Sequence, residues 1–244
     1  MDIQKRLSEI WASDYITTLP AQVKEKGFYS VESRSQADLL FAGFNPSHHL
    51  DEPANSQFDF YLRFLATRTF DKDFAKINDM IDGLLLAKSK ITYTDLFYFR
   101  EKQEFLREQI LPNPNGIRFV AEQLNLTQHI LEEVIVPKLI VVVNREADAY
   151  FGKFYDEKGW VWMGYKFQFI QKMACGELYK ITGLIESPHR IAPEFKTTNL
   201  ENSYVLFTQT IGQEKNASEL PSSAVIKTLL DCYEAEKNVR KLAI

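Results

Sequence analysis

The stretch ADLLFAGFNPSHH, residues 37 to 49, decides the fold. Asp38 to Gly43 is a short apolar run bounded by glycine and proline, which is the pattern of a buried strand. Gly43 permits a sharp turn and a close backbone approach, and Pro46 pushes Asn45 toward extended geometry. Open α/β folds bind their ligands where such strands end. We therefore predict a functional site at this strand end.

A second stretch repeats this pattern further along the chain. Residues 138 to 143, KLIVVV, form an unalternated apolar run, which suits a strand covered on both faces. Asn144 ends the run, and Arg145 to Phe151 has the pattern of a short helix closed by Gly152. Strand, polar turn and helix thus follow one another twice, which favours a mostly parallel sheet flanked by helices.

The remaining segments supply further helices and strands. Helical spacing of apolar residues predicts helices over 3–18, 58–65, 72–87, 101–110, 117–135, 201–211 and 222–240. Alternation and β-branched or aromatic residues predict strands over 91–99, 160–163, 166–172 and 177–184, with polar connections over 20–35 and 186–199. We expect one α/β domain over 1–244, a three-layer sandwich with an extra strand and hairpin region. Its N-terminal helix (1–36) and C-terminal helices (200–244) are extensions.

Composition narrows the class of protein without naming a function. The 244 residues are 45% hydrophobic, which is enough for a sizeable core. A net charge of −4 argues against a nonspecific nucleic-acid coat. Two cysteines, Cys175 and Cys232, are too few for a disulfide framework or a cysteine-rich metal site. No apolar run is long enough to span a membrane, and the start is not a signal peptide, so we expect a cytoplasmic protein.

Four short motifs carry a resemblance to a known family. Phe41-Ala42-Gly43-Phe44-Asn45-Pro46-Ser47 resembles the first motif of the uracil-DNA glycosylase superfamily, closest to its mismatch-specific branch, whose strand ends in Gly-Ile-Asn-Pro. Pro53-Ala54-Asn55 and the aromatic residues after it resemble the Pro-x-Asn-Arg-Phe-Trp segment. Residues 137 to 143 are similar to the family's Pro-Lys-Val-Ile-Val strand, and Tyr93-Thr94-Asp95-Leu96 stands where the family has a Thr-Asn turn. The similarity covers residues 37 to 190 and rests on the order of the motifs.

The resemblance implies an enzyme that hydrolyses the bond between a base and deoxyribose after the base flips out of DNA. Such a site needs a positioned water, donors aimed at the base and exclusion of bulk solvent. Asn45 stands at the catalytic position, where the matching asparagine of the mismatch-specific branch places the water. DNA, single- or double-stranded, is the implied partner, and we expect neither a metal nor a dissociable cofactor. The alternative for Gly43 to Pro46 is an ordinary strand-to-loop turn.

The resemblance also implies a set of substrate-binding residues around Asn45. Gly43, Phe44, Pro46 and Ser47 belong to the first motif and would line the base pocket. The phenylalanine shelf of the mismatch-specific branch falls near His49 and Leu50 in this chain, so the candidates for stacking on a base are His48, His49 and Phe58. A solvated pair of loop histidines is the alternative.

A late motif completes the comparison imperfectly. Ser187-Pro188-His189-Arg190-Ile191 stands in for the family's His-Pro-Ser or Asn-Pro-Ser loop. His189 would be a second catalytic residue that donates to the leaving base, Ser187 and Arg190 would contact the substrate, and Ile191 would be the wedge in the minor groove. A polar surface loop is the alternative.

Two further polar residues have a functional and a structural interpretation each. Asn144 has the paired donor and acceptor that read a base edge, or it caps the helix that follows. Asp95 binds a water near the pocket, or it makes a structural hydrogen bond. Three functions remain open: a DNA glycosylase, a non-catalytic nucleobase- or nucleic-acid-binding protein on the same fold, and an unrelated α/β protein. With His189 as its second catalytic residue, the glycosylase hypothesis requires Asn45, Asn144 and His189 to face one cavity.

Overall fold

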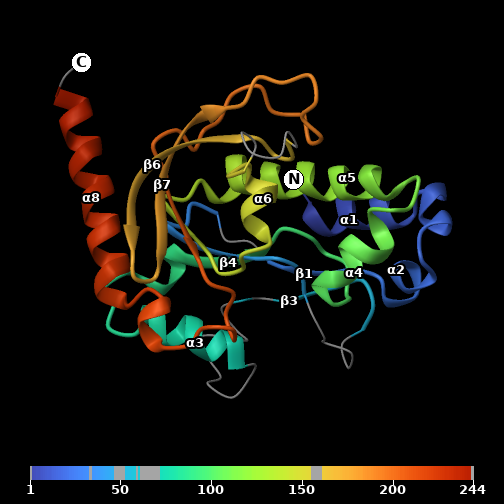
Figure 1. Cartoon of the computed structure of the whole chain (residues 1–244), viewed down its shortest axis with the longest axis horizontal. Coiled ribbons are helices and arrows are strands. Elements are labelled where there is room, and N and C mark those ends of the chain that lie inside the picture. The colour runs from blue at the N-terminus through green and yellow to red at the C-terminus, as the bar shows by residue number, and fades with distance from the viewer. Residues whose placement is uncertain are drawn as a thin grey trace.

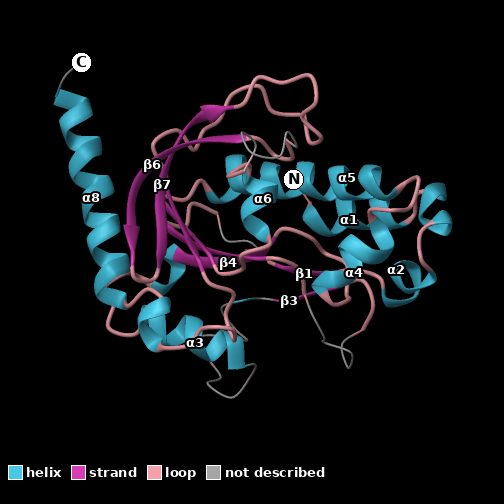
Figure 2. Cartoon of the chain, in the orientation of Figure 1, coloured by secondary structure: helices cyan, strands magenta, loops and turns pink. Residues whose placement is uncertain are grey.

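The computed structural model describes residues 2–32, 35–46, 53–58, 60, 72–154 and 161–242. Its centre is a six-stranded sheet in the order β4–β2–β5–β8–β7–β6, drawn in magenta in Figure 2. The strands are β4 (Ile91–Asp95), β2 (Leu39–Gly43), β5 (Leu139–Val142), β8 (Tyr204–Thr208), β7 (Gly176–Leu184) and β6 (Tyr165–Met173). The first four run parallel, and β7 and β6 are antiparallel to their neighbours. A separate parallel pair joins β1 (Tyr29–Val31) to β3 (Ser56–Phe58).

One face of the sheet is covered by helices from the first two thirds of the chain. These are α1 (Ile3–Trp11), α5 (Gly116–His129) with its π-helical continuation η5 (Ile130–Ile135), and α6 (Ala147–Phe151). Figure 1 shows α1 and α5 side by side, and their apolar residues share one core cluster with β2 and β5. Apolar residues at helical spacing on α5, such as Phe119, Val120 and Leu124, are fully buried.

The opposite face is covered by α3 (Lys72–Ile81) and α8 (Ser223–Leu242). Ile77 of α3 and Ile226 of α8 pack in a second cluster with Leu39 and Leu139 of the sheet. The central strands are therefore buried on both faces, as their unalternated apolar sequences predict. This mixed α/β architecture, with a mostly parallel sheet flanked by helices, confirms the predicted fold class.

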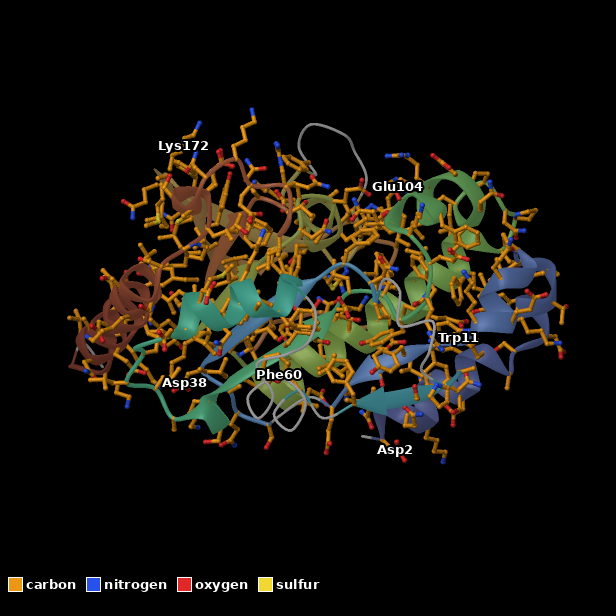
Figure 3. All side chains as sticks on the ribbon, turned by 90° about the horizontal axis from the view of Figure 1, so that it is seen from below. Asp2, Trp11, Asp38, Phe60, Glu104 and Lys172 are labelled. Carbon is orange, nitrogen blue, oxygen red and sulfur yellow. The ribbon has the colours of Figure 1, made fainter. Side chains whose placement is uncertain are left out.

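The parallel strands end together at one edge of the sheet. Gly43 lies beside Asp95 in the register of β2 and β4, and Val142 of β5 lies between Ala42 and Phe207. The segments that follow all four strands are thereby brought to the same edge. In Figure 3, Asp38 before β2 and Glu104 after β4 lie on opposite sides of the molecule.

Several predicted elements are confirmed with shifted ends. The helices predicted over 117–135, 145–151 and 222–240 correspond to α5 with η5, α6 and α8, and the strands over 166–172 and 177–184 correspond to β6 and β7. The predicted helix over 3–18 is α1 followed by the 3₁₀ segment η1 (Asp14–Thr18), and that over 101–110 is α4 (Gln103–Phe105) with the π-helical η4 (Leu106–Ile110). The strand over 91–99 ends at Asp95, and the helix over 72–87 ends at Ile81.

Other predictions were wrong. The segment predicted as a helix over 201–211 contains the buried strand β8. The connection over 20–35 contains α2 (Ala21–Lys26) and β1, and the strand predicted over 160–163 is reduced to one bridge between Val161 and Arg190. Of the helix predicted over 58–65, Phe58 instead ends β3 and Phe60 is helical, while 59 and 61–65 lie outside the described residues. Of the described helices, none is both long and apolar enough to cross a bilayer.

Candidate functional site

A cavity of about 350 Å³ lies at the edge where the parallel strands end. Its walls come from the segments after β2, β4, β5 and β8, together with α3, β1 and β3. The lining residues are Tyr29, Gly43, Phe44, Asn45, Pro46, Phe58, Phe74, Ile77, Tyr93, Asp95, Lys102, Gln103, Glu104, Val143, Asn144, Thr210, Ile211 and Gln213. A volume of this size is at the lower end of the range for small-molecule sites.

Gly43 allows two polar side chains of β4 to approach the end of β2. A Cβ atom on Gly43 would overlap with Oη of Tyr93 and Oδ1 of Asp95. Because Gly43 has no side chain, the Asp95 carboxyl packs against its backbone and accepts a hydrogen bond of 2.7 Å from the Tyr93 hydroxyl. Glycine at this position therefore serves the site through close packing rather than through an unusual backbone angle.

Asp95 is the buried acid of the cavity. Burial raises the pKa of its carboxyl from 3.8 to about 7, and the hydrogen bond from Tyr93 opposes that rise. Only 5% of the residue is exposed. A carboxyl group with a pKa near neutrality takes up and releases protons at physiological pH, which is the property of a general acid or base.

Asn45 is held in one orientation by the backbone after β4. Its amide nitrogen Nδ2 donates to the carbonyl oxygens of Phe99 at 3.1 Å and Glu101 at 2.6 Å. Both partners are acceptors, so the nitrogen must face them and the amide cannot be turned over without losing both bonds. Among the described residues no donor to the oxygen Oδ1 is seen, and this atom can accept a hydrogen bond from a water or a ligand.

Asn144 makes local hydrogen bonds at the cavity wall. Its Oδ1 accepts from the backbone N–H of Glu146 at 2.9 Å, and its Nδ2 donates to Oε1 of Gln103 at 2.8 Å. The first bond is an Asx turn, which fixes the entry into α6. The structural interpretation of Asn144 thus has an observed partner, while the side chain also lines the cavity.

One wall of the cavity is aromatic. Phe58 stacks on Tyr29 with ring centroids 5.1 Å apart, and Phe74 meets Phe58 at 6.3 Å and Tyr93 at 5.1 Å, both edge-on. Contacts among these rings fix their positions. The cavity therefore combines aromatic side chains with polar groups on Asn45 and Asp95, an arrangement that suits a polar ring.

The structure brings together seven of the residues predicted from sequence. These are Gly43, Phe44, Asn45, Pro46, Phe58, Asp95 and Asn144. The expected shared cavity therefore holds Asn45 and Asn144. Ser47, His48 and His49 lie outside the described residues.

The late loop is not part of this cavity, contrary to the expectation for His189. Ser187, His189, Arg190 and Ile191 are absent from its described lining. The Ile191 N–H donates to the carbonyl of Val161, and the Arg190 guanidinium donates to the carbonyls of Ala192 and Phe195. Ser187 Oγ accepts from the backbone N–H of His189, as in a surface turn. The loop precedes the last parallel strand, so it does not reach the edge where that strand ends.

Sequence reasoning missed the segment that does reach the cavity from this side. Thr210, Ile211 and Gln213 follow β8, and the Thr210 hydroxyl accepts from the backbone N–H of Arg145 at 3.1 Å. Recognising Tyr204–Thr208 as a strand would have identified them, because residues after a parallel strand lie at the ligand-binding edge. Gln103 and Glu104 were missed because they lie eight and nine positions beyond the end of β4.

Comparisons with known proteins do not assign this site. No family model matches the chain, and no curated protein matches it. Across the described ranges, no group of three or more His, Cys, Asp or Glu side chains is arranged to hold a metal ion. The function is therefore argued from the buried acid, the oriented amide and the aromatic wall.

Proposed function

We propose that this chain is a DNA glycosylase-like hydrolase that cleaves the N-glycosidic bond between a uracil or mismatched base and its deoxyribose. The observation that carries the proposal is the Asp95 carboxyl, with a pKa of about 7, in one cavity with the oriented amide of Asn45. The order of sequence motifs that resembles the uracil-DNA glycosylase superfamily gives independent support. We expect the protein to act in the cytoplasm, on DNA whose target base has flipped out.

In the proposed reaction, the bond between C1′ and the base nitrogen breaks and its electron pair leaves with the base. Positive charge develops on the sugar and negative charge on the base. A water that donates a hydrogen bond to Oδ1 of Asn45 forms the new bond to C1′ through its oxygen. Its proton passes to the ionised Asp95 carboxylate, and the departing base takes a proton from solvent.

The aromatic wall gives the proposal a place for the base. Phe58 lines the cavity beside Tyr29, and stacking of a base on an aromatic side chain contributes roughly 1–3 kcal/mol. Asn144 and Gln103, whose amides are hydrogen-bonded to each other, line the same cavity and would meet the edge of a base through their remaining donors and acceptors. Stacking and edge contacts together would hold the flipped base while the bond to the sugar breaks.

The test is excision of uracil from labelled oligonucleotides, single-stranded and with a G·U mismatch, read out as strand breaks after alkali treatment. We expect cleavage by the unchanged chain, with a rate that rises with pH up to about 7, because the carboxylate is the active form. Asp95→Asn keeps the shape and should lower the rate about 100-fold or more. Asp148→Asn, at a buried acid outside the cavity, is the matched control and should leave cleavage nearly unchanged.

A nucleobase-binding protein without cleavage is the second candidate. The net charge of −4 and the acidic side chain of Glu104 in the lining favour it, because both oppose a long contact with phosphates. Binding of a uracil-containing strand without strand breaks, weakened by Phe58→Ala, would establish this candidate and refute the hydrolase. The absence of both binding and cleavage would refute both candidate functions.

A further inference from the structure

The outer edge of β6 has the features of a strand that is open to pairing. β6 is the last strand in the order of the sheet, and no described strand pairs with its other side. Lys166 and the five residues Gln168 to Lys172 are exposed. Two large apolar side chains are among them: Phe169 is 54% exposed and Ile170 is 39% exposed. An exposed strand edge offers free backbone N–H and C=O groups to another chain.

An apolar groove of about 340 Å³ lies next to this edge, between the hairpin of β6 and β7 and helix α8. Ile170 and Met173 of β6, Leu178 of β7, and Val225 and Leu229 of α8 are among its lining residues. The groove is separate from the cavity of the candidate site, with which it shares no lining residue. An edge strand and an adjacent groove are the two parts of a surface that binds an extended peptide.

Charge distinguishes between the possible occupants. β6, with the sequence YKFQFIQKM, carries Lys166 and Lys172 and no acidic residue, in a chain whose net charge is −4. Two copies paired antiparallel about Phe169 would place Lys166 of one copy opposite Lys172 of the other, and like charges directly opposite destabilise a strand pair.

We propose that β6 binds an extended segment of another protein as an added strand, with acidic residues at both ends of that segment and apolar residues at alternate positions. Side chains of a strand point alternately to its two faces. One set would enter the groove against Met173 and Leu229, and the other would cover the ring of Phe169. The acidic ends would pair with Lys166 and Lys172.

The test uses two pools of synthetic peptides of nine residues, the length of β6. Their central positions alternate between Thr and one of Val, Ile, Leu or Phe, and the ends are Asp-Glu in one pool and Lys-Lys in the other. The full chain is immobilised, and retained peptides are identified by mass spectrometry. We expect enrichment from the acidic pool only, and protection of β6 amides from hydrogen exchange when a retained peptide is added.

A variant with both Lys166→Glu and Lys172→Glu should bind a retained acidic peptide about tenfold or more weakly. Ile170→Ser should also weaken binding of the peptide by removing part of the groove. All three positions are exposed, so the fold should persist by circular dichroism. Lys227→Glu on the exposed side of α8 is the matched control. No enrichment from the acidic pool, or equal affinity in the double variant, would overturn the proposal. Self-association of the chain through β6 in sedimentation would overturn it in favour of a second copy.

Discussion

Asp95 is a residue whose ionisation opposes folding. Its pKa in the folded chain, about 7, lies above the value of 3.8 for an unperturbed aspartate, because burial penalises the charged form. Between about pH 4 and pH 7 the folded chain therefore holds a proton that the unfolded chain has released. Fewer protons on the unfolded chain mean that the free energy of unfolding falls as pH rises through this range.

The stability of Asp95→Asn should accordingly depend less on pH than that of the unchanged chain. Between pH 5 and pH 8, ionisation of Asp95 should lower the free energy of unfolding of the unchanged chain by roughly 2–3 kcal/mol. The amide of Asp95→Asn does not ionise, so this loss should be absent from the variant. Urea unfolding at the two pH values measures the difference. Asp148→Asn is the control. Burial raises the pKa of Asp148 to about 6, so its ionisation should lower the free energy of unfolding between pH 5 and pH 8 by roughly half as much as that of Asp95. A pH profile unchanged by Asp95→Asn would contradict the assignment.

Asn45 contributes to stability through its two amide hydrogens. Asn45→Asp would turn carboxylate oxygens toward the carbonyl oxygens of Phe99 and Glu101, where no donor remains. We expect a loss of about 2–4 kcal/mol in the free energy of unfolding, measured with urea at pH 8. Asn238→Asp makes the same chemical change at an exposed position of α8 and should alter stability by less than about 0.5 kcal/mol. Equal effects at the two positions would show that the bonds to Phe99 and Glu101 contribute nothing.

Local sequence rules identified Gly43, Asn45, Asp95 and Asn144 because each stands at or just after the end of a recognisable strand. The same rules could not give the pKa of Asp95 or the orientation of Asn45. Burial of the carboxyl depends on the absent side chain of Gly43, and the amide is held by carbonyls more than fifty positions away. Such long-range contacts leave no local pattern.

At the scale of elements, Glu132 of η5 holds the segment that leads into β8. Its carboxylate accepts from the Thr198 hydroxyl and from the Asn199 N–H, both at 2.6 Å, while its carbonyl accepts from Nδ2 of Asn199 at 3.0 Å. Glu132 is fully buried. This link connects the end of α5 to the start of the last parallel strand.

Glu132→Ala should therefore destabilise the fold by about 2–4 kcal/mol, because the Thr198 hydroxyl and the Asn199 N–H lose their acceptor in a buried place. Thermal unfolding measures the loss, and hydrogen exchange should show increased opening of β8. Glu133→Ala, at the neighbouring and exposed position, is the control and should change stability little. A variant Glu132→Ala as stable as the control would exclude this role.

The strand β8 also explains the largest error in the predicted elements. Its sequence, YVLFT, is buried at every position, so it shows no alternation. A continuous apolar run without alternation cannot be distinguished from part of a buried helix by periodicity. With a helix expected there, Thr210 is not recognised as a residue that follows a parallel strand. The β5 run escaped the same error because Val and Ile dominate it.

At the scale of the whole molecule, an excess of acidic residues limits how the chain can contact DNA. With a net charge of −4, binding has to rely on a few cations near the cavity rather than on a broad basic face. Lys102 lines the cavity and Arg145 follows β5 beside Thr210, and both are exposed. A small number of phosphate contacts gives a weak dependence of affinity on salt. For single-stranded DNA, each contact contributes about −0.7 to the slope of log affinity against log salt concentration.

We therefore expect a slope of roughly −1 to −3 for log affinity against log salt, measured by fluorescence anisotropy with a uracil-containing single strand and Asp95→Asn. Lys102→Ala and Arg145→Ala should each reduce the magnitude of that slope by about 0.7. Lys227→Ala, on the exposed surface of α8, should leave it unchanged. A steep slope insensitive to Lys102 and Arg145 would place the phosphate contacts on another face. Asn45 and Asp95 would then lie away from the bound strand, and the cavity would not be the site of base cleavage.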